Sequence, residues 1–437
     1  SHLIQSQAVH DAVTFLVDRL PPPPTGMTLI IASRTDPPLP LPRWRVREEV
    51  VELRAADLAF SVAETAVYLR NTTTLTLSKQ EIAALTARTE GWIAGLQMAA
   101  LSMQGRDPKT VPDFIRSFTG SHHYILDYLS EEVLQQQPKS IQNFLLQTAI
   151  LDRLSKPLCD AVMGFTNSKM SSQQILAQLE TDNLFIIPLD DERCWYRYHH
   201  LFADLLRNRL TALHPELVPI LHLRASEWYE AVDSPKEAIA HAFKAQDYER
   251  IADLVEKYAR NMLHQSKYTV LSSWIEALPA TIVSTRPWLC VYQSWTRHWA
   301  GLREGGEECL QTAEKQLDMR EKNEKEKRLI AGYMATIRAH YALTNEDIPC
   351  VLAQAQKALR LLPEDNYFTR STASVALGGA YWGTGDSVSA EQTYDECAAN
   401  ALLGGYPYRA SSALCYKGIQ QVKQARLRQA QETCLLY

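Results

Sequence analysis

The sequence predicts a mainly helical chain in which a truncated α/β segment is followed by a helical domain, a winged helix and helical repeats. Three observations predict this order. A continuously apolar run at 27–33 is typical of a strand in a parallel sheet. Residues 121–212 alternate helices with two short strands, as winged helices do. From residue 213 onward, small residues recur at helical offsets, as in a solenoid of tetratricopeptide-like repeats.

Residues 1–57 are predicted to be the remnant of an α/β domain. HDAVTFLVDRL (10–20) has helical spacing, and MTLIIAS (27–33) and EEVVELR (48–54) are predicted strands. Two strands and a helix cannot cover both faces of a sheet, so we expect further strands upstream. The chain also begins without Met, and we interpret it as a fragment.

Residues 58–120 are predicted to form a small helical domain. Ser61 with Glu64, and Ser78 with Glu81, have the spacing of capping boxes, which predicts two helix starts. A third helix is expected over 91–103. Its apolar stripe is predicted to consist of Ile93, Leu96, Ala100 and Leu101.

Residues 121–212 are predicted to form the winged helix, with strands at 183–189 and 194–199 and a return helix at 200–210. A DNA-binding winged helix needs Lys or Arg on the helix before the strands, because neutralised phosphates supply most of the affinity. SSQQILAQLET (171–181) has neither, and the turn is the acidic DDER. We therefore expect this winged helix to pack against protein.

Residues 213–437 are predicted to be helical repeats. Small side chains let two antiparallel helices approach closely, and aromatic ones fill the gap to the next pair. The positions that carry this pattern are Ala238, Ala242, Ala245, Val351, Ala355, Ala358, Leu377, Gly378, Tyr381, Ala390, Tyr394 and Cys397.

Composition excludes several classes of protein. The formal net charge of -5 argues against a general basic surface for nucleic acid. Eight scattered cysteines suggest neither a zinc ribbon nor a disulfide framework. No apolar stretch reaches the about 18 residues of a membrane span, so we expect a cytoplasmic location and no membrane contact. Nucleotide-binding, hydrolase and metalloprotease motifs are absent, so the chain is not expected to be an enzyme.

Two positions are candidates for anion binding. His199 and His200 lie where the second strand meets the return helix, and unpaired N–H groups at a helix start favour an anion such as phosphate. Metal binding, acid/base chemistry and a buried histidine at a domain interface are the alternatives. Arg34 follows the strand at 27–33, where open α/β sheets bind ligands. It could sense a phosphate, or it could pair with Asp36.

Long motifs carry a resemblance to a known family. LIIASRTDPPLPLPRWR, TEGWIAGLQMAALSM and NLFIIPLDDERCWYRYHHLFADLLR resemble the MalT-like, LuxR-type ATP-dependent transcriptional regulators of bacteria, which are signal-transduction ATPases. The resemblance runs from residue 2 to about 260 and more loosely to 437. It identifies residues 1–57 as the C-terminal remnant of a P-loop NTPase domain, and it implies that the P-loop and a C-terminal helix-turn-helix lie outside this chain.

The resemblance also implies a switch. ADP would hold a resting state, and ATP plus a small-molecule or protein inducer on the repeats would promote self-association and transcription. Arg34 would face the γ-phosphate and His199 the β-phosphate of ADP, with Mg²⁺ bound only in the full-length parent, a slow switch ATPase. DNA would be bound only through the absent C-terminal domain. No nucleotide is expected to bind tightly to this chain alone.

Four aromatic residues of the repeats are candidates for inducer binding, although packing between repeats is the alternative. They are Tyr381, Trp382, Tyr406 and Tyr408. A second functional hypothesis is a protein-interaction scaffold with a vestigial NTPase remnant, because helical solenoids offer extended binding surfaces.

Overall fold

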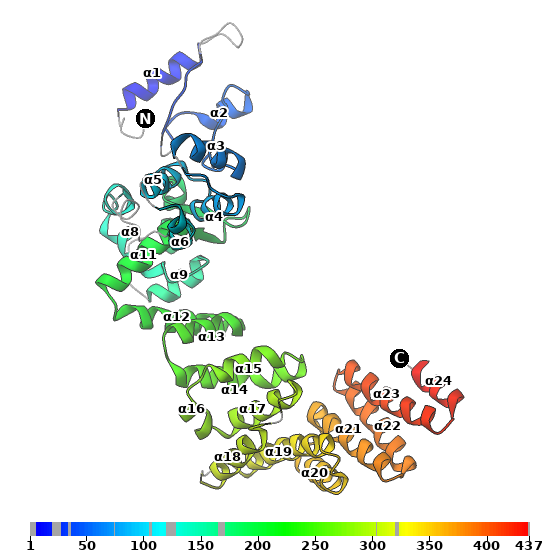
Figure 1. The fold of residues 1–437 in the computed structure, drawn as a ribbon. Coiled ribbons are helices and arrows are strands. Elements are labelled where there is room, and N and C mark those ends of the chain that lie inside the picture. The colour runs from blue at the N-terminus through cyan, green and yellow to red at the C-terminus, as the bar shows by residue number, and fades with distance from the viewer. Residues whose placement is uncertain are drawn as a thin grey trace. The chain divides into compact units, whose positions relative to one another are not determined.

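The computed structural model describes residues 6–19, 28–33, 36–73, 75–104, 107–118, 128–164, 171–302, 304–319 and 323–435. It divides into two compact units, Ser1–Asp233 and Ser234–Tyr437. Helices dominate both units (Figure 1), which confirms the predicted fold class. The predicted domain boundaries after residues 57, 120 and 212 stay predictions. No helix in the described part of the chain has the length and apolarity that a membrane crossing requires.

The first unit begins with two helices, α1 (Gln7–Val17) and α2 (Leu41–Val46). Asp18 joins them, because its carboxylate accepts hydrogen bonds from Arg43 and from the Trp44 indole. Neither strand predicted for this region forms in the residues that the structure describes. A strand exists only through a ladder with a neighbour, and no neighbouring strand is present among these residues.

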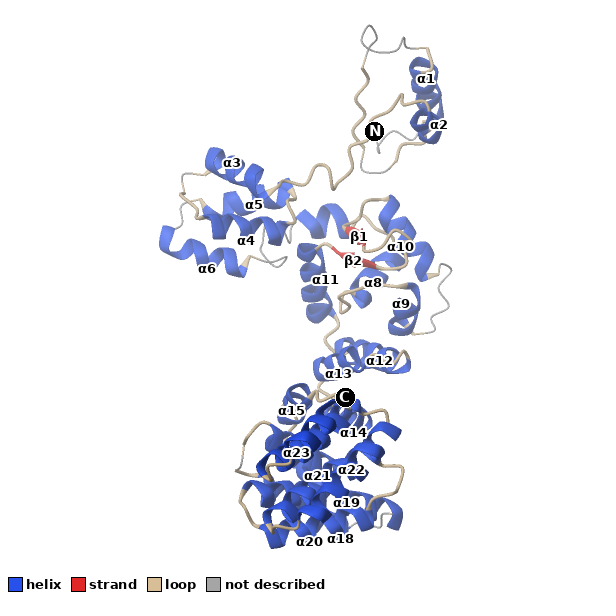
Figure 2. Cartoon of the chain, turned by 90° about the vertical axis from the view of Figure 1, so that its right-hand side faces the viewer, coloured by secondary structure: helices blue, strands red, loops and turns tan. Residues whose placement is uncertain are grey.

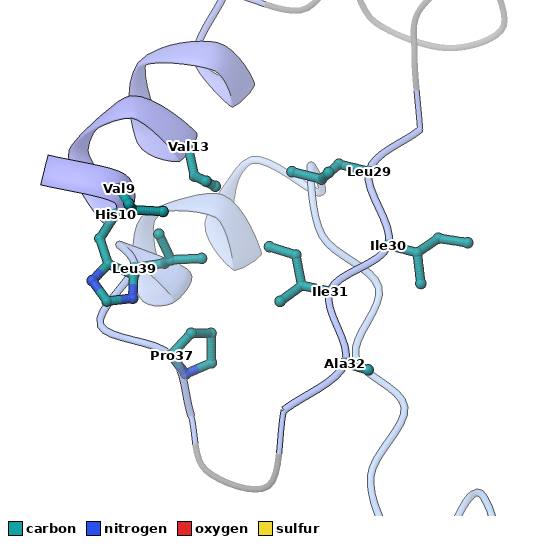
Figure 3. Close-up of a pocket in the computed structure, with 9 residues that line it drawn as sticks. All are labelled: Val9, His10, Val13, Leu29, Ile30, Ile31, Ala32, Pro37 and Leu39. Carbon is teal, nitrogen blue, oxygen red and sulfur yellow. The ribbon is translucent and has the colours of Figure 1, made fainter. Parts of the chain in front are cut away.

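Residues 28–33 nevertheless keep the side-chain pattern of a strand. Leu29 and Ile31 point toward α1 across a hollow that Val9 and Val13 also line, whereas Ile30 points to the opposite side (Figure 3). Ile30 is 89% exposed. Alternation with a period of two is the strand geometry, so the predicted pattern is present without its hydrogen bonds.

The helical domain contains α3 (Val62–Thr72), α4 (Lys79–Thr89), α5 (Ile93–Met103), a 3₁₀ turn η1 (Pro108–Thr110) and α6 (Val111–Ser117). Both predicted capping boxes are confirmed. In α5, Leu96 and Ala100 are buried as predicted. Ile93 and Leu101 are exposed, and Met103 faces the core instead.

The winged helix follows the predicted order of elements. It comprises a π-helical turn η2 (Leu129–Leu134), α8 (Lys139–Thr148), α9 (Lys156–Met163), α10 (Ser172–Thr181), β1 (Ile186–Pro188), β2 (Tyr196–Tyr198) and α11 (His200–Leu213), after which α12 (Leu217–Ala231) packs on α9. The strands pair antiparallel, with Ile187 opposite Arg197 (Figure 2). One apolar core runs from Leu69 in the helical domain to Ala225 in α12.

The second unit contains helices joined by short turns. They are α13 (Pro235–Lys244), α14 (Tyr248–His264), α15 (Tyr268–Glu276), α16 (Ala280–Thr285), α17 (Pro287–Trp299), α18 (Gly306–Met319), α19 (Glu324–Thr344), α20 (Ile348–Leu361), α21 (Tyr367–Gly383), α22 (Ser387–Leu403), α23 (Pro407–Lys423) and α24 (Leu427–Leu435). Three turns share one device: a residue with positive φ is followed by an aspartate whose carboxylate caps the next helix. These aspartates are Asp247, Asp347 and Asp386.

Small residues form the helix contacts of the repeats, as the sequence predicts. Ala355, Ala390 and Cys397 are fully buried between helices. Gly378 in α21 lies against the ring of Tyr394 in α22, and a Cβ atom added at Gly378 would approach that ring to 2.7 Å. Close approach of α21 and α22 therefore requires a glycine at 378.

We predict that Gly378→Ala lowers the free energy of unfolding of the repeats by about 1 kcal/mol, because overpacking outweighs the gain in helix propensity. Gly379→Ala is the matched control. The nearest atom to a Cβ there is in Leu343, at 3.5 Å, which is an ordinary van der Waals contact, so this variant should be neutral or slightly more stable. Urea denaturation of both variants provides the measurement, and equal effects would contradict the packing described.

Candidate functional site

The joint between the helical domain and the winged helix contains the predicted histidine. His199 follows β2 and is the N-cap of α11. Its backbone N–H donates to the carbonyl of Phe185, 2.8 Å away, which fixes the end of β2 beside the preceding strand segment. The side chain is buried, with Trp92 and Phe185 packed edge-on against the imidazole.

Both ring nitrogens of His199 have partners in the protein. Nδ1 accepts the backbone N–H of Leu201 at 3.3 Å, and Nε2 lies 3.0 Å from the carbonyl oxygen of Thr89. Because Nδ1 is an acceptor, these partners assign the ring proton to Nε2, which donates it to Thr89. The neutral imidazole thus caps α11 and links it to the end of α4.

Glu90, the next residue after Thr89, supplies a carboxylate to the same helix start. Arg197 donates two hydrogen bonds to its two oxygens, each 2.8 Å long. The backbone N–H of His200 donates a third, at 2.9 Å. The carboxylate of Glu90 thus lies at the start of this helix, a position that favours an anion. Binding of a phosphate by His199, which the sequence predicted, stays a prediction.

The backbone turn after α4 holds this carboxylate in place. Glu90 adopts the left-handed conformation as the C-cap of α4, and Gly91 has a φ of +71°. The carbonyl of Gly91 accepts the N–H of Phe60 at 2.9 Å, and a Cβ at Gly91 would lie 2.5 Å from the Phe60 carbonyl oxygen. Glycine is therefore required at 91 for both conformation and space. We call residues 89–91 with Arg197, His199 and His200 the α4–α11 joint.

Charge in the joint is balanced by burial and hydrogen bonds. Burial alone would raise the pKa of Glu90, but the bonds from Arg197 and His200 and the nearby histidine lower it to about 2. Burial lowers the pKa of His199, although Glu90 and the Thr89 carbonyl act in the opposite direction. Glu90 is thus ionised and His199 neutral at pH 7.

The remaining predicted site residues lie elsewhere. Arg34 is outside the described residues, and Asp36, its alternative partner, is bound by Arg54 at 2.6 Å. The convergence of positions 34 and 199 on one phosphate pocket therefore stays a prediction. The ring of His199 offers no free nitrogen to a metal ion or a proton-transfer step, so the buried interfacial histidine is the interpretation that the geometry fits.

The four aromatic candidates of the repeats do not form one group. Tyr381 is half-buried against two small clusters of the repeats. Trp382 lies under the ammonium of Lys423, 4.2 Å from it, and Tyr408 is 76% exposed. Tyr406 packs against one of the two clusters that Tyr381 contacts, and its hydroxyl bonds His264. Their role in inducer binding stays a prediction.

Sequence analysis missed Glu90 and Arg197. They are 107 positions apart, and no local periodicity connects them. One signal was present: an acidic residue followed by glycine directly after a helix marks a left-handed cap that projects a carboxylate. A partner for it could not be named without the fold.

Comparisons with known proteins find matches for the winged helix and for the helical repeats. A family model described as the MalT winged helix domain matches residues 130–218, and one described as the MalT-like TPR region matches residues 332–435. HTH-type transcriptional regulator MalT of Yersinia pestis (strain Pestoides F) is 30% identical over 377 residues, 86% of this chain and 41% of the relative. The chain thus spans about two fifths of the length of the MalT relatives it matches.

Two further similarities were found. Serine/threonine-protein kinase PknK of Mycobacterium tuberculosis (strain CDC 1551 / Oshkosh) is 33% identical over 297 residues, 67% of this chain and 26% of the kinase. A crystal structure of a Signal Transduction ATPase with Numerous Domains protein with a tetratricopeptide repeat sensor, from Pyrococcus horikoshii, has a TM-score of 0.47 and 14% sequence identity. That similarity covers 87% of this chain and 54% of the other.

The described fold is that of a winged-helix protein with a helical domain before the winged helix and a helical repeat array after it. Both matched domains point to one family. The chain contains a MalT winged helix domain at residues 130–218 and a MalT-like TPR region at residues 332–435, and it is similar in sequence to MalT regulators.

We predict that Glu90→Gln weakens the α4–α11 joint by about 2 kcal/mol, because an amide leaves the Arg197 charge half-buried without its counter-charge. Amide hydrogen exchange of α11 in the 437-residue chain measures the opening free energy. Asp113→Asn is the control, since its pair with Arg116 is largely exposed and contributes at most about 0.5 kcal/mol. Equal effects of the two substitutions would rule out the joint as described.

The joint should also weaken in acid. The pKa of His199 is below its usual 6.5 in the folded chain. As pH falls below 6.5, the imidazole of the unfolded chain is therefore protonated before that of the folded chain, and the free energy of unfolding declines. Glu90 contributes stability above 4.5 that is lost as pH falls toward 2. Hydrogen exchange of α11 against pH should show both declines. Glu90→Gln should remove only the lower one, and a flat profile between pH 7 and 3 would contradict the assignment.

Proposed function

We propose that the chain is the switch and sensor portion of an ATP-dependent, inducer-responsive transcriptional regulator of the LuxR type. In this proposal ADP holds the resting state, and ATP with an inducer on the repeats promotes self-association and transcription in the cytoplasm. The similarity to MalT, an HTH-type transcriptional regulator, supports transcription as the output. The TPR match at 332–435 supports the sensor.

The observation that carries the switch is the α4–α11 joint. It binds the winged helix to the helical domain through a few charged and neutral hydrogen bonds that meet at one helix start. Such a set can break together, because loss of the carboxylate removes the counter-charge of Arg197 and the acceptor of the His200 N–H. A joint of this kind suits a two-state element whose equilibrium a second site can bias.

The described residues do not form a phosphate site by themselves. The Nε2–H of His199 is donated to Thr89, and the N–H of His200 is donated to Glu90. We therefore assign the switch to the joint and derive no step through the nucleotide. Control by ADP and ATP, and the role of Arg34, stay predictions for the longer protein.

The similarity to the kinase PknK supports a role for this chain in sensing and switching, upstream of the output of the protein. MalT is described as a transcriptional regulator and PknK as a protein kinase, yet both share much of this chain. A region common to proteins with different described outputs is better suited to sensing and switching than to the output itself. This favours the hypothesis of a switch and sensor portion over that of a protein-interaction scaffold. A scaffold does not need a charged joint between its domains.

The test is His199→Asn in the full-length gene. Asparagine still caps a helix, but it is too short to reach the Thr89 carbonyl, so only the link between domains is lost. RNA sequencing against a deletion strain first identifies the transcripts that depend on the protein. Those transcripts should then rise about tenfold without inducer, as expected for loss of about 1.4 kcal/mol from the resting state.

Cys194→Ser is the control for this experiment, because Cys194 is exposed at the turn of the two strands, away from the joint. It should leave basal transcription unchanged. Wild-type basal levels with His199→Asn, in a protein of normal abundance, would refute the switch role of the joint.

A further inference from the structure

Five side chains from distant parts of the second unit meet in one cluster. His264 ends α14, Trp299 ends α17, Phe368 begins α21, Tyr406 precedes α23 and Arg409 lies in its first turn. The Tyr406 hydroxyl lies 3.0 Å from Nδ1 of His264, and the Phe368 ring is 4.5 Å from the imidazole. We call these five residues the Arg409 cluster.

Arg409 is a cation without a counter-ion in this cluster. Its guanidinium carbon is 4.6 Å from the ring centroid of Phe368 and 5.6 Å from that of Trp299. Within the described residues it makes no ion pair, and its side-chain N–H groups have no hydrogen-bond acceptor. A guanidinium has five N–H donors in a fork that fits a carboxylate or phosphate, and aromatic faces satisfy none of them fully.

Two buried ring nitrogens nearby, in His264 and Trp295, lack partners among the described residues. If the Tyr406 hydroxyl donates to Nδ1 of His264, the imidazole proton is on Nε2, and this buried nitrogen has no partner among the described residues. The indole Nε1–H of Trp295, stacked on Phe368, is buried and unpartnered in the same way. Buried polar groups normally find partners. The guanidinium of Arg409 and the indole of Trp295 can only donate, so a group that satisfies both must supply acceptor atoms.

The electrostatics of the cluster agree with this. Burial, together with the charges of Arg260 and Arg409, lowers the pKa of His264 to about 4. His340 behaves similarly: burial lowers its pKa to about 4, and its neighbours His298 and Arg409 act in the same direction against the Thr372 carbonyl. The charged groups acting on both imidazoles are therefore basic, and no carboxylate offsets them.

We propose that the Arg409 cluster binds a small anionic ligand, a carboxylate or a phosphate monoester with an aromatic or apolar body. The anion pairs with the guanidinium of Arg409 and accepts from Nε2 of His264, and the body lies against Trp299, whose side chain is 38% exposed. On the proposed function of the chain, this ligand is the inducer. Of the four aromatic residues predicted from sequence, the proposal selects Tyr406, which orients His264.

The test is isothermal titration calorimetry of the 437-residue chain at constant ionic strength. The probes are phenyl phosphate, benzoate and inorganic phosphate, with neutral benzamide for comparison. At least one aromatic anion should bind with a Kd of about 1 mM or tighter, and benzamide should not. If only phenyl phosphate binds, the ligand is a phosphate, and if only benzoate binds, the ligand is a carboxylate. If inorganic phosphate bound as tightly as phenyl phosphate, the proposal that the ligand has an aromatic or apolar body against Trp299 would be overturned.

Arg409→Gln should weaken the binding at least about tenfold, as expected for loss of a charge-assisted pair. Arg428→Gln, at a 92% exposed side chain in α24, should not change it. Equal binding by Arg409→Gln and wild type, equal binding of benzamide and the anions, or no binding of either aromatic anion at about 10 mM would overturn the proposal.

A measurement on the wild-type chain guards against misfolding of the variant. An anion beside His264 stabilises the imidazolium, so saturation with the ligand should raise the His264 pKa from about 4, as followed by NMR. An unchanged pKa in the presence of a bound anion would place that anion elsewhere and overturn the assignment. Failure here leaves the proposed switch intact, because His199 lies in the other unit and its transcription test does not depend on this cluster.

Discussion

The carboxylate of Glu90 meets the N–H groups at the start of α11, and the connection between the helical domain and the winged helix depends on this contact. Three consecutive residues of one turn bind two other segments: the Thr89 carbonyl binds His199, the Glu90 carboxylate binds Arg197 and His200, and the Gly91 carbonyl binds Phe60. The apolar core beneath supplies most of the burial. Polar bonds of this kind fix which surfaces meet, because no other register pairs all their donors and acceptors.

The two units differ in how completely their polar groups are paired. In the α4–α11 joint, the side chains of Glu90, Arg197 and His199 find acceptors and donors within the protein. In the Arg409 cluster, the guanidinium of Arg409 and Nε2 of His264 have no hydrogen-bond partner in the described residues. A joint that is closed by its own carboxylate suits a switch, whereas a cationic surface that lacks an acceptor suits a sensor.

Local sequence rules predicted the local structure well. The capping boxes at Ser61 and Ser78 formed because both partners of a box lie within one turn, so no tertiary contact is needed. Small residues such as Ala355 were buried because only they permit close helix contacts. The strand predicted at 27–33 failed for the opposite reason: a ladder needs a neighbour that local periodicity cannot provide.

Long-range partners could not be predicted from the same rules. An anion at the start of α11 followed from helix electrostatics, but the pattern did not reveal that a residue 107 positions before Arg197 would supply it. The stripe of α5 was misplaced at Ile93 and Leu101, because the face that a helix buries is set by its neighbours and not by periodicity alone.

The α4–α11 joint depends on direct coupling between Glu90 and Arg197. A double-mutant cycle with Glu90→Gln and Arg197→Gln, measured by hydrogen exchange of α11 at pH 7, tests this most directly. We expect a coupling energy of about 1 to 3 kcal/mol, since the pair is bidentate and half-buried. A coupling energy below about 0.3 kcal/mol would show that the two residues act independently, and it would contradict the central role of this contact.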